Sequence, residues 1–348
     1  MVRYSKLAFR QTVHQYGTDL CWTPMILAKE FNRNHFARDS DFTISTKGVQ
    51  PPTIVQFGAN VPLELARASA LVVPYCSGVD LNCGCPQSWA CAETLGAALM
   101  EKRELVRDMV IETRTHLRQD GWGVDLEKDM DDPKGRSVSV KIRVHKDLRK
   151  TFDFITTVLG DPNNRNIDFL TIHPRTRYTP SSTPINVEAL ETLTSTFGKQ
   201  VPILVSGDVF TLSTLPFTSP LHQPPTLTAK DSVEQQPSNS LINLPHLAGL
   251  MSARAILANP ALYAGHNACP WEAVDTFLNN VVRCPLPFKL VLHHITEMVS
   301  PGMGPNKRAL LNKQERSALM GCGNMVDLID FLDERRAAVG GLKRDGGR

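Results

Sequence analysis

The stretch that decides the fold is VDLNCGCPQSW, residues 79–89. Its short apolar start ends at Asn82, and the tight corner CGCP follows before a helical pattern begins. A cysteine on a corner shaped by glycine and proline, just past a strand end, lies where a parallel α/β fold carries its chemistry. The alternative is that Cys83 and Cys85 are two buried small hydrophobic residues, as most free cysteines are. The rest of the chain has to separate the two interpretations.

The composition is that of an ordinary globular protein. Among 348 residues, 42% are hydrophobic and 21% are charged, and the net charge of +3 neither requires nor excludes nucleic acid. The chain contains no apolar run long enough for a membrane helix, and its first 17 residues have no apolar core of signal-peptide length. Eight cysteines in a chain of this length do not form a disulfide framework. We therefore expect a reducing compartment, the cytoplasm or the nucleus, and no membrane partner.

Predicted strands and helices alternate over most of the chain. The clearest strand is SVSVKIRV, residues 137–144, which alternates with period two. Strands that alternate with helices indicate a parallel sheet covered on both faces. The predicted strands are 19–23, 53–57, 79–82, 137–144, 167–173, 201–206 and 247–251. The predicted helices are 3–16, 62–73, 92–118, 147–159, 186–197 and 253–264.

The strand count is seven, and the chain opens in a helix. A closed eightfold barrel needs one more strand, before residue 1. We therefore predict an α/β fold of the TIM-type (β/α)8 barrel class that lacks its first strand and is followed by a small C-terminal helical domain.

The predicted domains are a cofactor-binding barrel over 1–268, a helical domain over 269–340 and a disordered tail over 341–348. Residues 211–245 are rich in Pro, Ser and Thr with little periodicity, which indicates an insertion within the barrel. Beyond residue 270 strand patterns cease, and apolar residues recur at helical spacing. The tail combines basic residues with glycines.

Polar side chains stand at the carboxyl ends of the predicted strands. In a barrel these ends meet at one mouth, so residues far apart in sequence converge there. Each residue could instead have only a structural role: Lys141 could extend its ammonium group to solvent, and His173 could be a hydrogen-bonded histidine of the core. Their recurrence on consecutive strands instead favours a shared site. The residues are Gln56, Asn82 with Cys85, Lys141 with Arg143, His173 with Arg175, Ser206-Gly207-Asp208, and Arg254.

The residue types at this mouth fit a flavin mononucleotide. Gly207 lets backbone N–H groups approach a phosphate, and Arg254 offers a bidentate fork. Lys141 and His173 add positive or donor character suited to a ring that holds negative charge when reduced. Gln56 presents an amide to the edge of a flat heterocycle. No GxGxxG follows an early strand, which argues against a dinucleotide site.

Metal binding is the competing interpretation of the cysteines. Cys83, Cys85 and Cys91 are close in sequence, but no CxxC or second pair accompanies them. Structural zinc usually takes four ligands. We therefore expect no metal.

Over residues 1–265 the sequence resembles the tRNA-dihydrouridine synthases, most of all the eukaryotic branch that acts on D-loop uridines 20a and 20b. The helical C-terminus, residues 269–340, resembles that family's RNA-binding domain in position and composition, which implies that it binds tRNA. The segments that carry the resemblance are MVRYSKLAFR, DLCWTPMI, ARDSDF, IVQFGAN, VDLNCGCPQSWA, VKIRVHKDL, TIHPRTR, VPILVSGD and ARAILANPALYAG.

This resemblance implies FMN as cofactor, NADPH as co-substrate and tRNA as partner. NADPH would reduce the flavin, and hydride would pass to C6 of a flipped-out uracil while Cys85 protonates C5 from the opposite face. A thiol is mostly protonated at neutral pH, as a general acid must be. The implied flavin contacts are Met1, Val2, Gln56, Lys141, His173, Ser206, Gly207, Asp208, Ala253 and Arg254. The implied substrate contacts are Asn82, Arg143 and Arg175.

The sequence departs from the family pattern at several positions. It starts at the Met1-Val2 of an Ala-Pro-Met-Val-like segment, and the strand before that segment is absent, which matches the count of seven. Ser206 replaces an Asn, while Pro174 and Ala255 stand where Gly is usual. The insertion at 211–245 is also longer than in the family.

The sequence therefore predicts an FMN enzyme, acting as a monomer, that reduces specific uridines in tRNA. One alternative is an FMN barrel acting on a free pyrimidine or another small enone; the helical region after residue 270 argues against it. The other is a flavin-free RNA-binding scaffold that has lost catalysis; Cys85, Lys141 and His173 argue against that. An absorbance spectrum separates the flavin-free scaffold from the two enzymes. An assay that compares the reduction of tRNA with that of orotate separates the two enzymes.

Overall fold

The computed structural model describes residues 4–43, 49–124, 132–221, 241–305 and 307–345, with side chains as far as residue 338. Met1 and Val2, two of the predicted flavin contacts, lie outside the described residues.

The central sheet begins with two short strands on one neighbour. β1 (Cys21–Trp22) and β2 (Ile26–Leu27) both pair in parallel with β3 (Thr53–Gly58). A single strand is predicted over 19–23. The pairing is interrupted between the two pieces at Pro24, which has no N–H group to donate to the ladder.

The remaining strands extend this sheet in chain order, each parallel to its predecessor. Every residue of β3 and β4 is buried, as expected where helices cover one face and a packed interior the other. These strands are β4 (Gly78–Cys83), β5 (Ser137–Arg143), β8 (Phe169–His173), β9 (Ile203–Ser206) and β10 (Leu247–Met251).

The sheet is open on one side. β1 and β10 lie at the two ends of the strand order and share no backbone pairing within the described residues. With β1 and β2 counted as one interrupted strand, the described part of the chain supplies seven strand positions. This is a TIM-type (β/α)8 barrel that lacks one strand, and it confirms the predicted fold class.

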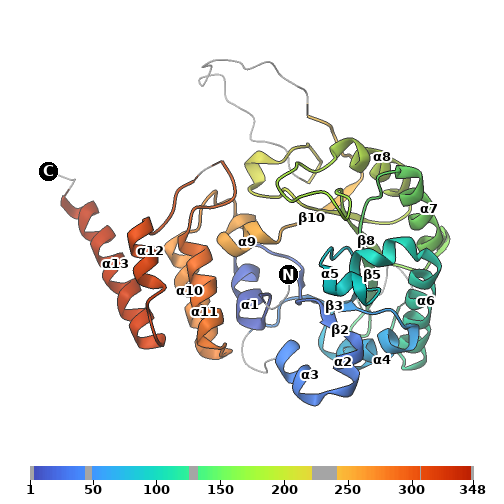
Figure 1. Cartoon of the computed structure of the whole chain (residues 1–348), viewed down its shortest axis with the longest axis horizontal. Coiled ribbons are helices and arrows are strands. Elements are labelled where there is room, and N and C mark those ends of the chain that lie inside the picture. The colour runs from blue at the N-terminus through green and yellow to red at the C-terminus, as the bar shows by residue number, and fades with distance from the viewer. Residues whose placement is uncertain (1–3, 44–48, 125–131, 222–240, 306, 346–348) are drawn as a thin grey trace.

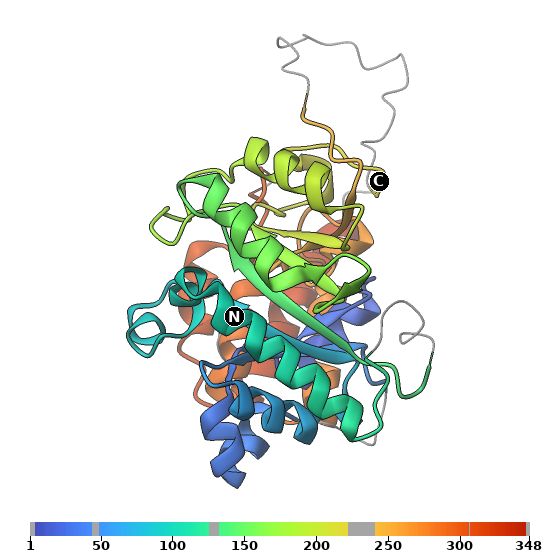
Figure 2. The same ribbon diagram turned by 90° about the vertical axis from the view of Figure 1, so that its right-hand side faces the viewer.

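Helices cover the outer face of the sheet. They are α4 (Pro62–Val72), α6 (Arg103–Gln119), α7 (Leu148–Leu159) and α8 (Val187–Phe197). Figure 2 shows α6 in blue-green and α7 in green, lying side by side across the strands. Asp147 caps α7 by accepting from the N–H of Arg149, and Asn186 caps α8 by accepting from the N–H of Ala189.

The long helix predicted over 92–118 is interrupted. The structure has α5 (Ser88–Ala92), a 3₁₀ segment (Gly96–Glu101) and then α6. Thr94 and Gly96 have positive φ, of 56° and 58°, which ends α5 before the 3₁₀ segment. The helix predicted over 253–264 is likewise split into α9 (Arg254–Ala258) and a 3₁₀ turn (Leu262–Ala264).

Four short elements have no counterpart among the predicted ones. They are α2 (Ala28–Arg33), α3 (His35–Asp41), β6 (Gly160–Asp161) and β7 (Asn164–Arg165), the last two forming an antiparallel pair. Each is too short to show a clear hydrophobic period.

The chain ends in helices, as predicted, and Figure 1 shows them as a layer beside the barrel. They are α10 (Trp271–Arg283), α11 (Phe288–Val299), α12 (Lys313–Leu319) and α13 (Met325–Asp345). Because α13 runs to Asp345, residues 341–345 are helical where a disordered tail is predicted. An existing helix gains a backbone hydrogen bond with each added residue, and this outweighs the glycine content of the segment.

α1 (Leu7–Gln15) packs on these C-terminal helices rather than on the barrel core. Phe9 lies against Phe277 of α10 with ring centroids 6.3 Å apart, and His294 of α11 stacks on Phe9 at 4.7 Å. The molecule thus has two cores, one inside the barrel layers and one shared by α1, α9 and the C-terminal helices. The domain boundaries drawn from sequence stay a prediction.

The two ends of the predicted insertion are joined by backbone hydrogen bonds. Thr218 and Asn243 form an isolated bridge, with the N–H of Thr218 bonded to the carbonyl of Ile242 and the N–H of Leu244 bonded to that of Thr218. The central part of the insertion, residues 222–240, lies outside the described residues.

Candidate active site

The turn that carries Cys85 follows β4 and is held by its backbone. The side-chain oxygen of Asn82 accepts from the N–H groups of Gly84 at 3.0 Å and Cys85 at 2.8 Å. The carbonyl of Cys85 accepts from the N–H of Ala97 at 2.8 Å. A Cβ on Gly96 would lie 2.5 Å from that carbonyl oxygen, so the 3₁₀ segment supports the turn only with glycine there. The Cys85 side chain is half-buried.

Cys83 differs from Cys85 in its surroundings. It is fully buried, and burial raises the pKa of its thiol well above the ordinary value. Cys83 therefore fits the interpretation of a small hydrophobic residue, whereas Cys85 is open to a reacting partner.

Arg143 joins two loops of the mouth. Its Nε donates to the carbonyl of Gly84 at 2.8 Å, and its Nη1 donates to the carbonyl of Thr176 at 2.8 Å. Gly84 precedes Cys85, and Thr176 follows Arg175 in the loop after β8. The thiol loop and the His173–Arg175 loop consequently lie on the same side of the barrel.

His173 and Arg175 form the second part of the site. Arg175 donates from Nη2 to Asp208 at 2.5 Å, from Nε to the carbonyl of Thr183 at 2.6 Å and from Nη1 to His173 Nε2 at 3.1 Å. The other oxygen of Asp208 accepts from the N–H of Ile185 at 2.8 Å. Both oxygens of Asp208 are thus engaged within the protein, one by Arg175 and the other by the backbone of Ile185.

His173 is neutral. Burial lowers its pKa to about 2, and four nearby cations lower it further: Lys141, Arg143, Arg175 and Arg254. Because Arg175 donates to Nε2, the ring proton lies on Nδ1, and His173 offers a neutral donor. Arg254 contributes the least of these four charges.

Gly207 permits a close approach in the turn after β9. Its φ is +107°, and a Cβ there would lie 2.9 Å from the His173 ring. The sequence Ser206-Gly207-Asp208 thereby packs its backbone directly against the His173 edge of the site.

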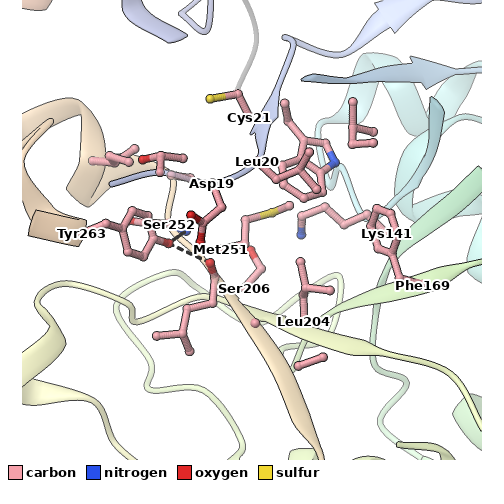
Figure 3. Close-up of a pocket in the computed structure, with 18 of the residues that line it drawn as sticks. Asp19, Leu20, Cys21, Lys141, Phe169, Leu204, Ser206, Met251, Ser252 and Tyr263 are labelled. Atoms are coloured by element: carbon pink, nitrogen blue, oxygen red, sulfur yellow. Dashed lines mark hydrogen bonds between the residues drawn. The ribbon is translucent and has the colours of Figure 1, made fainter. Parts of the chain in front are cut away.

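A cavity of about 760 Å³ runs along the open side of the barrel, and Figure 3 shows its lining. Lys141 points into it, and no hydrogen-bond partner is found for its ammonium group within the described part of the chain. Burial lowers the pKa of Lys141 to about 8, with the charge of Asp80 opposing and that of Arg143 adding to the shift. Of the other predicted site residues, Gln56, Ser206 and Ala253 also line this cavity.

The rim of the cavity is fixed by Tyr263. Its hydroxyl donates to the carbonyl of Leu250 at 2.8 Å and accepts from the N–H of Ser252 at 3.0 Å, as the dashed lines in Figure 3 show. Arg254 begins α9 beyond this rim, and its Nη1 lies 3.4 Å from Ser181 Oγ.

Gln56 and Asn82 are joined to a carboxylate that the sequence analysis leaves unassigned. Gln56 donates to Asp80 at 2.7 Å and accepts from Asn82 at 2.8 Å. The signal for Asp80 is an acidic residue inside an otherwise apolar strand. The sequence gives no signal for Ser139, Thr176 and Ser181, because nothing in it marks which hydroxyl or carbonyl lies opposite a site residue.

Within the described residues, no three His, Cys, Asp or Glu side chains are arranged to hold a metal ion. None of the described helices is long and apolar enough to cross a membrane.

The sequence is similar to that of proteins from one known family. Residues 1–218 match the family model described as Dihydrouridine synthase (Dus). The chain is 34% identical over 334 residues to the tRNA-dihydrouridine(20a/20b) synthase [NAD(P)+] of Schizosaccharomyces pombe, covering 96% of this chain and 85% of that protein. It is 33% identical to the protein of the same name from Saccharomyces cerevisiae, covering 96% and 78%.

A third similar protein is human. The tRNA-dihydrouridine(20a/20b) synthase [NAD(P)+]-like protein of Homo sapiens is 31% identical over 334 residues, covering 96% of this chain and 88% of that protein. A family model that covers well over half of the chain and relatives that align along nearly all of it lead to one conclusion: this chain belongs to the dihydrouridine synthase family.

Proposed function

We propose that this protein reduces the C5=C6 bond of uridine to 5,6-dihydrouridine in the D-loop of tRNA, at positions 20a and 20b, using bound FMN and NADPH. The support comes from family membership, from relatives whose names carry this activity, and from the arrangement around Cys85.

The residues of the mouth fit FMN. Lys141 extends its ammonium group into the cavity, without a hydrogen-bond partner among the described residues, and Ser206 and Ala253 line the same space. Lys141 and His173 would face the ring. Ser206, Gly207, Ala253 and Arg254 would hold the phosphate, with Asp208 keeping Arg175 in place. When bound, FMN supplies the hydride that it receives from NADPH.

Cys85 is the general acid of this proposal. As C6 of the uracil receives the hydride, the Cys85 thiol transfers its proton to C5 from the opposite face. The backbone of the turn that carries the thiol is held from three sides, by Asn82, Arg143 and Ala97, which limits where the sulfur can lie. Arg143 and Arg175 supply positive charge beside the uracil and its phosphates.

The phosphate backbone of tRNA is expected to bind mainly at the barrel rim. Residues 271–340 contain eight basic and eight acidic residues, so the helical region is neutral overall. Lys141, Arg143, Arg175 and Arg254, in contrast, all lower the pKa of His173 through their charges. The target uridine leaves its stack to reach Cys85, which costs a few kcal/mol and is easier in a loop than in a helix.

The observation that carries the proposal is the bridge made by Arg143. Because one guanidinium bonds both Gly84 and Thr176, the proton donor and the His173–Arg175 group share one mouth. A separate location for either group would leave the reaction without an acid beside its redox partner.

Replacing Cys85 with Ala tests the acid directly. Cys85→Ala should keep bound flavin, seen as the absorbance near 450 nm of about one FMN per chain, and lose dihydrouridine formation by roughly a hundredfold or more, in the range of a general-acid contribution. Cys91→Ala is the matched control, since Cys91 lies six residues away in the adjoining helix, where its thiol donates to the Cys85 carbonyl at 3.7 Å.

Three results would overturn the proposal. Full turnover by Cys85→Ala on native tRNA excludes this thiol as the acid. Reduction of orotate but not of tRNA identifies a free-pyrimidine enzyme. A protein without yellow absorbance that gains none on addition of FMN is the flavin-free scaffold. Mass spectrometry of nuclease-digested tRNA locates the modified position, and parallel assays with NADH establish the preferred nucleotide.

A further inference from the structure

A buried carboxylate in the middle of β4 has no role in the reaction described so far. Asp80 is 1% exposed, and the pairing register places it beside Gln56 on β3 and Ser139 on β5. Asp80 and Asn82 are two residues apart in one strand, so both side chains point into the barrel. A charged group is rarely this buried unless its bonds serve the structure or the site.

The contacts of Asp80 form a continuous chain to Cys85. Ser139 Oγ donates to one carboxylate oxygen at 2.7 Å, and Gln56 Nε2 donates to the other at 2.7 Å. Gln56 Oε1 then accepts from Asn82 Nδ2 at 2.8 Å. Asn82 Oδ1 in turn accepts the N–H groups of Gly84 and Cys85.

The donor and acceptor of each hydrogen bond between Asp80 and the Cys85 turn are determined by the groups at the two ends of the series. An ionised carboxylate only accepts, so Gln56 must turn its NH₂ group toward Asp80 and its oxygen toward Asn82. The backbone N–H groups of the turn only donate, so Asn82 must present its oxygen to them. The two amides fit between these ends in one orientation.

The charges around Asp80 are consistent with an ionised carboxylate at neutral pH. Burial raises its pKa to about 6, opposed by the bonds from Ser139 and Gln56 and by the charge of Lys141. The other titratable group that senses this carboxylate is Cys83, whose pKa is raised well above neutrality. Lys141 is therefore the counter-charge of Asp80.

We propose that Asp80 is a positioning residue, which holds the Cys85 turn in its productive orientation through the amides of Gln56 and Asn82. The proposal rests on the role of Cys85 in the proposed function. Asp80 touches neither substrate nor thiol. It acts through the side chains of Gln56 and Asn82, whose amide orientations it fixes.

Two substitutions of nearly the native shape separate this role from a purely structural one. Asp80→Leu removes the acceptor that orients Gln56, whereas Asp80→Asn retains an acceptor oxygen while removing the charge. Ser139→Ala is the matched control, because it removes the other bond to the carboxylate and leaves the chain to Cys85 intact. Asp80→Ala also lacks the acceptor and replaces Asp80→Leu if the leucine variant does not fold.

The kcat on tRNA should depend on whether residue 80 keeps an oxygen that accepts the hydrogen bond from Gln56. We expect kcat to fall at least about tenfold in Asp80→Leu with KM for tRNA changed less than about threefold, since a misplaced acid weakens the transition state and not substrate binding. Asp80→Asn and Ser139→Ala should remain within about threefold of the native kcat. The absorbance of bound flavin should be unchanged in all variants.

A second measurement needs no turnover and so stands apart from the proposed function. The rate of Cys85 alkylation by iodoacetamide, followed on the Cys85 peptide by mass spectrometry, should change by about fivefold or more in Asp80→Leu and stay near native in Asp80→Asn, because only the first frees the turn. If Cys85→Ala is fully active while this pattern holds, the acid assignment fails and the positioning chain stands.

A double-mutant cycle completes the test. Asn82→Ala cuts the chain next to the turn, so adding Asp80→Leu should produce no further change in the alkylation rate. Native alkylation and native kcat in Asp80→Leu, or effects of the two substitutions that multiply fully, would overturn the proposal. Loss of function in Asp80→Asn equal to that in Asp80→Leu would also overturn it, because the charge and not the acceptor would then be responsible.

Discussion

Gln56 connects the cavity to the buried carboxylate of β4, because its amide bonds Asp80 on one side and Asn82 on the other. Its position at a strand end predicts a polar group in the mouth, and it does line the cavity. Its amide, however, is occupied by Asp80 and Asn82 as well as facing that space. Residue types and strand positions follow from the sequence. The partner of each donor depends on register and side-chain direction, which a single strand does not reveal.

At the residue scale, Lys141 should give the enzyme a basic limit in pH. Its pKa is lowered to about 8, so its positive charge is present below that pH and is lost as the pH rises through it. We expect the rate of flavin reduction by NADPH to fall as the pH rises through about 8, because the charge that stabilises a reduced, anionic ring disappears.

The pH dependence is measured by stopped-flow absorbance between pH 6.5 and 9.5. Flavin reduction in Lys141→Met should be slow throughout this pH range and should show no decline near pH 8. Lys146→Met, three residues beyond the end of β5, should keep the native profile. A native profile in Lys141→Met contradicts the assignment.

At the scale of elements, periodicity predicts the strands of the sheet to within a few residues, and it also predicts the helices that cover them. It fails where glycine conformation interrupts a pattern, as between α5 and α6, and where an element is too short to have a period, as in α2 and β6. The break at Gly96 has a functional meaning that periodicity cannot express. It places the 3₁₀ segment under the Cys85 carbonyl.

Gly96→Ala should therefore impair the Cys85 turn. The added Cβ would lie 2.5 Å from the Cys85 carbonyl oxygen and 2.8 Å from its Cβ, and the φ of +58° is strained for alanine. We expect a loss of about 2 kcal/mol or more in the free energy of unfolding, together with a fall in kcat.

Gly121→Ala is the control for the Gly96 substitution, because Gly121 has a φ of +84° and no atom within 4 Å of an added Cβ. It should cost about 1 kcal/mol from backbone strain alone and leave kcat unchanged. Urea denaturation and steady-state kinetics measure both variants. Equal losses in the two would show that the contact with Cys85 contributes nothing.

At the scale of the whole molecule, the sequence indicates a barrel followed by helices but not how the two meet. The amphipathic pattern of α1 predicts a buried face without naming its partner. In the structure that face packs on α10, where Asn280 also donates to Thr12 at 3.1 Å. The first helix thus connects the start of the barrel to the last part of the chain.

Because of this shared core, Phe277→Ala should destabilise the molecule and not α10 alone. Phe277 is fully buried against Phe9 and His294, and truncating such a side chain costs about 3–5 kcal/mol. Thermal unfolding should show one transition at a lower midpoint. Val282→Ala, at a 77% exposed position of the same helix, should have little effect. Two separate transitions, with only the smaller one shifted, would mean that the two cores unfold independently.

The open seam between β1 and β10 has a mechanical consequence. In a closed cylinder the ladder of backbone bonds sets the internal diameter, and the interior cannot widen without breaking it. Here the spacing along one wall depends on side chains instead: Trp22 meets Phe169 edge to face at 6.0 Å across the interior, and Tyr263 ties down the end of β10. Since such contacts shift in small steps, we expect this wall to adjust to the thickness of a planar guest while the opposite wall, which carries Cys85, keeps its shape.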